Sequence, residues 1–188
     1  MNNELKAYLI TDPKYYSNNS DLFKKNLTKV LERNKIDIIC FRDKESSNFE
    51  ELAKVFIEVC KRFNIEKILI NSDYKLAKQL GANGVHLNSK QFENIKEAKH
   101  LDLYVIISCH NFAEIEKAQK AHVNAITYSP IFKTPNKGEP LGINKFKQTL
   151  ELYEDIDIIA LGGIIDKEQI SQIEKTKAYG FASIRYFI

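Results

Sequence analysis

Positively charged side chains follow one short apolar segment of the sequence in a pattern suited to binding phosphate. Arg42 and Lys44 come directly after the apolar segment 36–41, and because they alternate, both side chains leave an extended chain on the same face. Arginine offers a planar fork and lysine a point charge, which together suit a phosphate or a diphosphate. A surface ion pair with Asp43 or Glu45 is the alternative interpretation.

Two histidines accompany other apolar segments. His110 follows Ser108 at the end of one of them, where an imidazole can transfer a proton near neutral pH or simply form a hydrogen bond at the start of a helix. His86 lies inside the apolar segment 84–87 and is predicted to point inward as a core residue.

The segment SPIFKTPNKGEPLG, residues 129–142, is a further candidate for ligand binding. Its three prolines limit the entropy that is lost when the segment orders over a ligand. Thr134, Asn136 and Lys137 offer hydroxyl, amide and ammonium donors. The segment is therefore predicted to be an anion-binding lid that excludes water.

A pair of glycines, Gly162 and Gly163, follows the apolar segment 157–161. Glycines let backbone N–H groups approach an anion closely, and a phosphate site is common at this place in barrel proteins. A plain tight turn would require the same residues, so both interpretations stay open.

Apolar segments that alternate with amphipathic ones must position these groups. The apolar segments are short and rich in β-branched residues, as expected for strands that are buried on both faces. They are residues 7–11, 36–41, 67–71, 84–87, 104–108, 125–129, 157–161 and 180–184. Helical periodicity is clear in residues 22–33, 48–63, 111–121, 143–153 and 167–177.

Eight strands separated by seven helices predict an α/β fold, the (β/α)₈ TIM barrel. An open doubly wound sheet is the alternative, and it is disfavoured because no glycine-rich dinucleotide motif follows the first strand. The sequence stops at Ile188, soon after the eighth strand, so the barrel is expected to be lean and to lack its eighth helix. One flank would then be uncovered unless a second copy packs on it, which suggests a homodimer.

Composition narrows the class of protein. A length of 188 residues predicts one domain, residues 1–188, and 44% hydrophobic with 28% charged residues is typical of a globular protein. The net charge of +3 is spread along the chain, which argues against nucleic-acid binding, and no apolar stretch predicts a signal peptide or a membrane helix. The three cysteines are not in CxxC spacing, which favours reduced thiols and a cytoplasmic location.

Six segments carry a family pattern that runs nearly from end to end of the sequence. They are YLITD (8–12), CFRDK (40–44), ILINSDYKLAKQLGANGVHLNSKQ (68–91), ISCHN (107–111), SPIFKTPNKGEPLG (129–142) and IIALGGI (158–164). Together they resemble the thiamine-phosphate synthase/TenI family. The resemblance implies a TIM barrel and a role in thiamine biosynthesis. Synthases of this family join a hydroxymethylpyrimidine diphosphate to a thiazole phosphate and release diphosphate with the help of magnesium.

The resemblance also implies which residues form the site. Those expected to face the pyrimidine diphosphate are Arg42, Lys44, Asn71, Ser108 and Lys137. Those expected to face the thiazole phosphate are Thr134, Asn136, Gly163, Ile184 and Arg185. Cys40, which stands where the family has a glutamine, and Gly162 complete the predicted substrate-binding set, and His110 joins Arg42, Lys44 and Lys137 as a catalytic candidate.

Several positions depart from the family pattern. Ser72 and Gln91 stand where the family has the aspartates that hold magnesium, and Lys90 precedes the second of them. Magnesium prefers carboxylate oxygens, so these residues argue against the Mg²⁺ that the resemblance implies and leave Asp73 as the candidate ligand. In addition, Pro130 replaces a histidine that some TenI-type members use.

Three functions agree with this pattern, and all three take a small phosphate or diphosphate ligand. The first is synthase-type coupling, against which the missing aspartates argue. The second is a TenI-like proton transfer on a thiazole phosphate with His110 as the proton shuttle, against which the missing histidine argues. The third is a binding protein for phosphate ligands that has lost catalysis.

Overall fold

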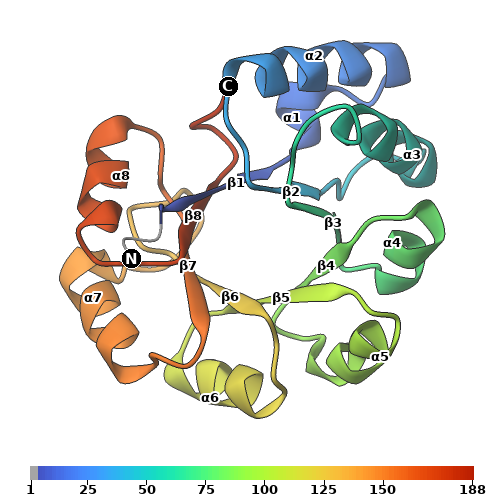
Figure 1. Cartoon of the computed structure of the whole chain (residues 1–188). Helices are drawn as coiled ribbons and strands as arrows, with labels where there is room; N and C mark the ends of the chain where they lie inside the picture. Colours follow the sequence, from blue (N-terminus) through green and yellow to red (C-terminus); the bar gives the residue numbers. More distant parts are fainter. Residues whose placement is uncertain (1–3) are drawn as a thin grey trace.

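Eight parallel strands form a closed barrel in the computed structural model, which describes residues 4–188 (Figure 1). The strands are β1 (Lys6–Ile10), β2 (Ile38–Phe41), β3 (Lys67–Asn71), β4 (Gly84–Leu87), β5 (Tyr104–Cys109), β6 (Ala125–Tyr128), β7 (Asp157–Leu161) and β8 (Gly180–Ser183). Neighbouring strands follow chain order, and β8 pairs in parallel with β1, which closes the ring. The predicted (β/α)₈ barrel is confirmed, and the open sheet is wrong.

Helices surround the barrel and connect successive strands (Figure 1). They are α2 (Ser20–Arg33), α3 (Phe49–Cys60), α4 (Tyr74–Leu80), α5 (Ile95–His100), α6 (Phe112–Lys120), α7 (Gly142–Leu152) and α8 (Lys167–Glu174), with the short α1 (Pro13–Tyr16) and a 3₁₀ turn, η1 (Phe92–Asn94). Asparagine or aspartate side chains accept backbone N–H groups at the start of α2, α6 and α8, which fixes where these helices begin. Within the described part of the chain, no helix combines the length and the apolar character needed to span a bilayer.

Alternate residues of the strands pack in two separate layers. Inward-facing side chains fill the centre of the barrel, namely Tyr8, Ile10, Ile38, Cys40, Leu69, Ile106, Ala125, Ile159 and Ala182. Their neighbours in sequence, such as Leu9, Ile39 and Ile70, face outward and pack beneath the helices. This alternation determines which residues at the strand ends can reach the centre of the barrel.

The chain itself covers the outer face of β8. Phe181 points outward, and the rings of Tyr186 and Phe187 pack against it with centroids 5.5 and 5.8 Å away. The side-chain amide of Asn34, just after α2, donates to the carbonyl oxygen of Phe187 at 3.4 Å, and Figure 1 shows this segment running from β8 toward α2. Phe181 and Phe187 are each only 5% exposed. The expectation of an uncovered flank is therefore wrong, because Tyr186 and Phe187 cover the outer face of β8. The homodimer stays a prediction.

Candidate phosphate-binding site

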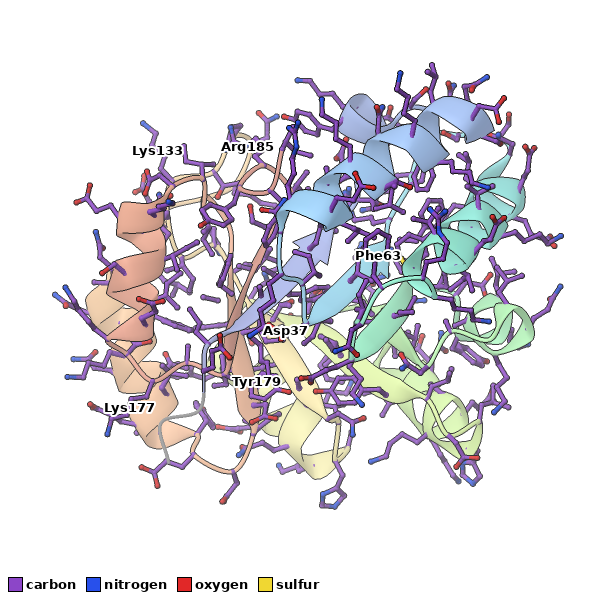
Figure 2. The ribbon with its side chains drawn as sticks, turned by 45° about the horizontal axis from the view of Figure 1, so that its top comes forward. Asp37, Phe63, Lys133, Lys177, Tyr179 and Arg185 are labelled. Carbon is purple, nitrogen blue, oxygen red and sulfur yellow. The ribbon has the colours of Figure 1, made fainter. Side chains whose placement is uncertain are left out.

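A cavity of about 670 Å³ opens at the carboxyl ends of the barrel strands, and residues at or after the ends of all eight strands line it. Figure 2 shows Lys133 and Arg185, which follow β6 and β8, at the upper end of the molecule, whereas Asp37 and Tyr179, which precede β2 and β8, lie lower. The volume is in the range of small-molecule binding sites. The predicted location of the site at the strand ends thus coincides with a real cavity.

Cationic side chains reach this cavity from the segments that follow β2, β4, β6 and β8. They are Arg42, Lys44, Lys90, Lys137 and Arg185. Among the described residues that line the cavity there is no aspartate or glutamate. Such a one-sided distribution of charge creates a strong positive potential in a concave space, which attracts anions.

Arg42 is held at the cavity by an acidic partner from a neighbouring strand. Its Nη1 atom lies 3.3 Å from Oδ2 of Asp12, which follows β1, and the guanidinium side chain is 29% exposed. Asp43 instead accepts the backbone N–H groups of Glu45 and Ser46, both at 2.9 Å. The alternative interpretation, an ion pair of Arg42 with Asp43 or Glu45, is therefore wrong, and Asp12 orients the guanidinium toward the cavity.

Backbone hydrogen bonds attach the segment 129–142 to the end of β7. The N–H group of Ile131 donates to the carbonyl oxygen of Leu161, and that of Phe132 donates to Gly162, both at 3.0 Å. The outer part of the segment is exposed, and Thr134 and Lys137 line the cavity. The segment is thus fixed at its base and extends over the site, as a lid requires.

The two glycines after β7 make this attachment possible. Gly162 and Gly163 have φ angles of 101° and 72°, a region that favours glycine. A Cβ atom on Gly162 would lie 2.8 Å from Cα of Pro130, and one on Gly163 would lie 2.7 Å from the carbonyl oxygen of Phe132. The N–H group of Gly163 donates to no acceptor among the described residues, and Gly163 lines the cavity. The pair is a tight turn that also leaves a backbone donor for an anion.

A polar network forms the floor of the cavity. The hydroxyl of Tyr8 lies 2.7 Å from Nδ1 of His86, and Nε2 of His86 lies 3.1 Å from Oγ of Ser108, with the hydroxyl of Thr127 at 3.4 Å. Burial, and to a lesser extent the charge of Arg42, lowers the pKa of His86 to about 4. The imidazole is therefore neutral at pH 7, with one ring nitrogen donating and the other accepting, and it orients the hydroxyl of Ser108.

His86 is a site residue that sequence reasoning placed only in the core. It is indeed buried, at 4% exposure, and it also lines the cavity. The sequence signal for this role is that His86 alternates with Val85 and Leu87, whose side chains face outward. This alternation directs the side chain of His86 toward the barrel centre near the strand ends.

The neutral state of His86 makes the stability of the protein depend on pH. His86 binds a proton near pH 6.5 in the unfolded chain but only near pH 4 in the folded chain. The contribution of neutral His86 to the free energy of unfolding is therefore complete above pH 6.5 and is lost as the pH falls toward 4. The loss amounts to roughly 3 kcal/mol. Urea unfolding between pH 4 and 7.5 should show a shallower pH dependence for His86→Gln than for the unmodified chain, whereas the exposed control His100→Gln should follow the unmodified chain. Parallel curves for all three proteins would contradict this prediction.

His110 lies at the rim of the cavity with one ring nitrogen free for a ligand. Its Nδ1 atom is 3.1 Å from the carbonyl oxygen of Ser129 and 3.2 Å from the hydroxyl of the same residue. Because a carbonyl oxygen only accepts, Nδ1 donates to it, and no described residue forms a hydrogen bond with Nε2. The backbone N–H of His110 donates to Glu114, which keeps the start of α6 in place.

Most of the residues predicted for the site line the same cavity. They are Arg42, Lys44, Asn71, Ser108, His110, Thr134, Lys137, Gly162, Gly163, Ile184 and Arg185. Lys90, which the sequence connected with the metal position and did not place among the site residues, also lines the cavity.

Three predicted residues lie outside the cavity lining. Cys40 points into the barrel interior next to Tyr8, where burial raises the pKa of its thiol to about 12. Asn136 is exposed on the outer part of the lid, with a φ of 58°. The carboxylate of Asp73 accepts the N–H group of Leu76 at 2.8 Å and thus caps α4. Strand alternation, the turn in the lid and helix capping direct these three side chains away from a ligand.

The residues at the positions of the family's aspartates do not fit a magnesium ion. Oγ of Ser72 lies 2.9 Å from the amide nitrogen of Asn71, and Oε1 of Gln91 accepts the amide of Asn88 at 2.6 Å. The amide nitrogen of Gln91 donates to the carbonyl oxygen of Ser72 at 3.0 Å, so the two side chains are joined in one neutral network. No cluster of three or more His, Cys, Asp or Glu residues suited to a metal occurs within residues 4–188. Magnesium prefers carboxylate ligands, and none faces the cavity here.

The closed ring of eight parallel strands defines this chain as a (β/α)₈ barrel protein with a cationic cavity at the carboxyl ends of its strands. The family model described as thiamine monophosphate synthase matches residues 7–187. The chain belongs to this family, which supports a role in thiamine biosynthesis and confirms the resemblance seen in the sequence.

Individual relatives agree with this assignment. "Putative thiamine-phosphate synthase 2" of Aquifex aeolicus (strain VF5) is 32% identical over 188 residues, which cover 97% of each chain. The thiamine-phosphate synthase of Lactococcus lactis subsp. lactis (strain IL1403) is 26% identical over 191 residues, 96% of this chain and 87% of that one. The solved structure of thiamine phosphate pyrophosphorylase from Pyrococcus furiosus superposes with a TM-score of 0.81 over 97% of this chain and 87% of that one, at 22% identity, which supports the fold.

Proposed function

We propose that this chain couples a hydroxymethylpyrimidine diphosphate to a thiazole phosphate. The observation that carries the proposal is the group of five cationic side chains around one cavity that has no acidic residue in its described lining. In this reaction the bond between the pyrimidine methylene carbon and the diphosphate oxygen breaks, and its electron pair leaves with diphosphate. The lone pair of the thiazole nitrogen forms the new C–N bond, so the thiazole becomes a thiazolium cation and no oxidant or reductant is consumed.

The cations act on the leaving group. Negative charge develops on the diphosphate as the bond breaks, and preorganised positive groups stabilise that charge most in the transition state. Arg42, Lys44 and Lys137 are assigned to this role, with Ser108 as a hydrogen-bond donor that His86 orients. The lid carrying Lys137 excludes water, which would otherwise attack the methylene carbon.

The other side of the cavity is assigned to the thiazole phosphate. Gly163 and Arg185 line the cavity after β7 and β8, and Thr134 lines it from the lid. Backbone and guanidinium donors of this kind bind phosphate oxygens with good geometry. Two anion sites in one cavity bring the nucleophile and the methylene carbon together.

A second candidate function is proton transfer on a thiazole carboxylate phosphate. The position of His110 favours it, because Nδ1 is fixed by Ser129 and Nε2 is left to accept a proton at the cavity rim. The two functions demand different residues. Coupling requires the diphosphate cations, whereas proton transfer requires the imidazole.

Turnover with defined substrates distinguishes these functions. We expect thiamine phosphate and diphosphate to form only when both coupling substrates are present, as measured by chromatography with fluorescence detection. Lys137→Ala should lower the coupling rate by at least tenfold, because it removes a charge-assisted contact to the leaving group. His110→Asn should lower it by less than threefold. If the coupling substrates give no thiamine phosphate, and a thiazole carboxylate phosphate is instead isomerised at a rate that His110→Asn abolishes and Lys137→Ala does not, the proton-transfer function is the correct one.

A further inference from the structure

We propose that the cavity binds diphosphate as the free anion, with the ammonium group of Lys90 taking the place of a magnesium ion. This inference rests on the proposed function, since it assumes that a diphosphate group occupies the cavity. The inference concerns whether diphosphate binds as the free anion or as its magnesium complex, which the family assignment does not determine.

The distribution of charge in the cavity suits a free diphosphate. Of the five cations, Arg42 is paired with Asp12, and none of the ion pairs formed by the described residues involves Lys44, Lys90, Lys137 or Arg185. A magnesium complex of diphosphate carries two fewer negative charges than the free anion, so its attraction to these cations is weaker. A metal ion in the same cavity would also face unneutralised positive side chains.

The neutral oxygens near the strand ends are already engaged within the protein. Oε1 of Gln91 accepts the side-chain amide of Asn88 at 2.6 Å and its backbone N–H at 3.2 Å, and Oγ of Ser72 lies within 2.9 and 3.4 Å of the amide nitrogens of Asn71 and Asn88. Binding a metal there would break these hydrogen bonds without supplying a carboxylate. The network holds the loop after β4 in shape and leaves no ligand set for a dication.

Lys90 lies on this same loop and lines the cavity. Its backbone N–H donates to Oδ1 of Asn88 at 2.9 Å, which fixes the turn that directs the side chain. Ser72 and Lys90 both line the cavity, so Lys90 belongs to the same wall as a position where the family holds its metal. A lysine at this position supplies positive charge to the diphosphate and repels a dication.

Calorimetry with inorganic diphosphate tests the inference without any turnover. Binding to the unmodified chain should be tightest in EDTA and should weaken at least tenfold in excess magnesium, with potassium chloride added to match the ionic strength. Lys90→Gln should weaken binding in EDTA by about 10- to 100-fold, as expected for one charge-assisted contact. Lys96→Gln, which removes an exposed lysine of α5 outside the cavity, should bind like the unmodified chain.

Variants that restore carboxylates provide the complementary test. Ser72→Asp combined with Gln91→Asp should weaken binding in EDTA and make magnesium tighten it. Binding by the unmodified chain that requires magnesium, or that magnesium tightens, would overturn this inference and leave the proposed coupling standing. An unmodified chain that is folded and binds no diphosphate in either buffer would overturn both.

Discussion

Replacing Arg42 and Lys137 together by alanine is expected to weaken the binding of diphosphate by about 100- to 20,000-fold, since each charge-assisted contact contributes roughly 1.5–3 kcal/mol. The two side chains line one cavity from the segments after β2 and β6, which are four strands apart in the ring of eight, so they are expected to hold opposite sides of the ligand. Removal of Arg42 also leaves Asp12 without its cationic partner beside the site, which adds repulsion toward an anion.

A matched control separates local contacts from the net charge of the protein. Lys54→Ala combined with Arg62→Ala removes the same two charges from the exposed side of the α3 region, away from the cavity. Calorimetry at fixed ionic strength should give the unmodified affinity for this control. Equal affinities for the two double variants would mean that Arg42 and Lys137 do not contact the ligand.

Gly163→Ala is expected to detach the lid from the barrel. The residue has a φ of 72°, which costs an alanine roughly 1–2 kcal/mol, and its Cβ would lie 2.7 Å from backbone atoms of Phe132 and Lys133. Backbone cannot move aside as a flexible side chain can, so we expect a total loss of about 2–4 kcal/mol in the free energy of unfolding. Diphosphate affinity should fall with it, because Lys137 and Thr134 are carried by the displaced segment.

Gly138→Ala is the control for this change. It lies in the same lid, and a Cβ atom there would meet nothing within 4 Å. Urea unfolding and calorimetry should therefore place Gly138→Ala close to the unmodified chain and Gly163→Ala far from it. If both variants are equally stable and bind equally well, the lid does not depend on its contact with Gly163.

Local sequence by itself determined the strands and their order. The predicted bounds 67–71, 84–87 and 157–161 coincide with β3, β4 and β7, because a strand buried on both faces needs a short run of apolar, mostly β-branched residues, which turn residues interrupt. The repetition of strand and helix then left few topologies, and eight parallel strands favour closure. The cavity at the carboxyl ends of the strands follows from this topology, which is why Arg42, Lys137 and Gly163 could be placed there from sequence.

Tertiary structure decided the partners of individual side chains. Arg42 pairs with Asp12, thirty residues away, and not with the adjacent acids, because neighbouring strands bring their ends together. Cys40 faces the closed interior, Asp73 caps a helix, and Tyr186 and Phe187 cover β8. Each of these placements depends on the inward or outward direction of a side chain or on packing between segments. A one-dimensional pattern records which residues are apolar and how they alternate, but contacts between strands that are tens of residues apart arise only when the barrel closes.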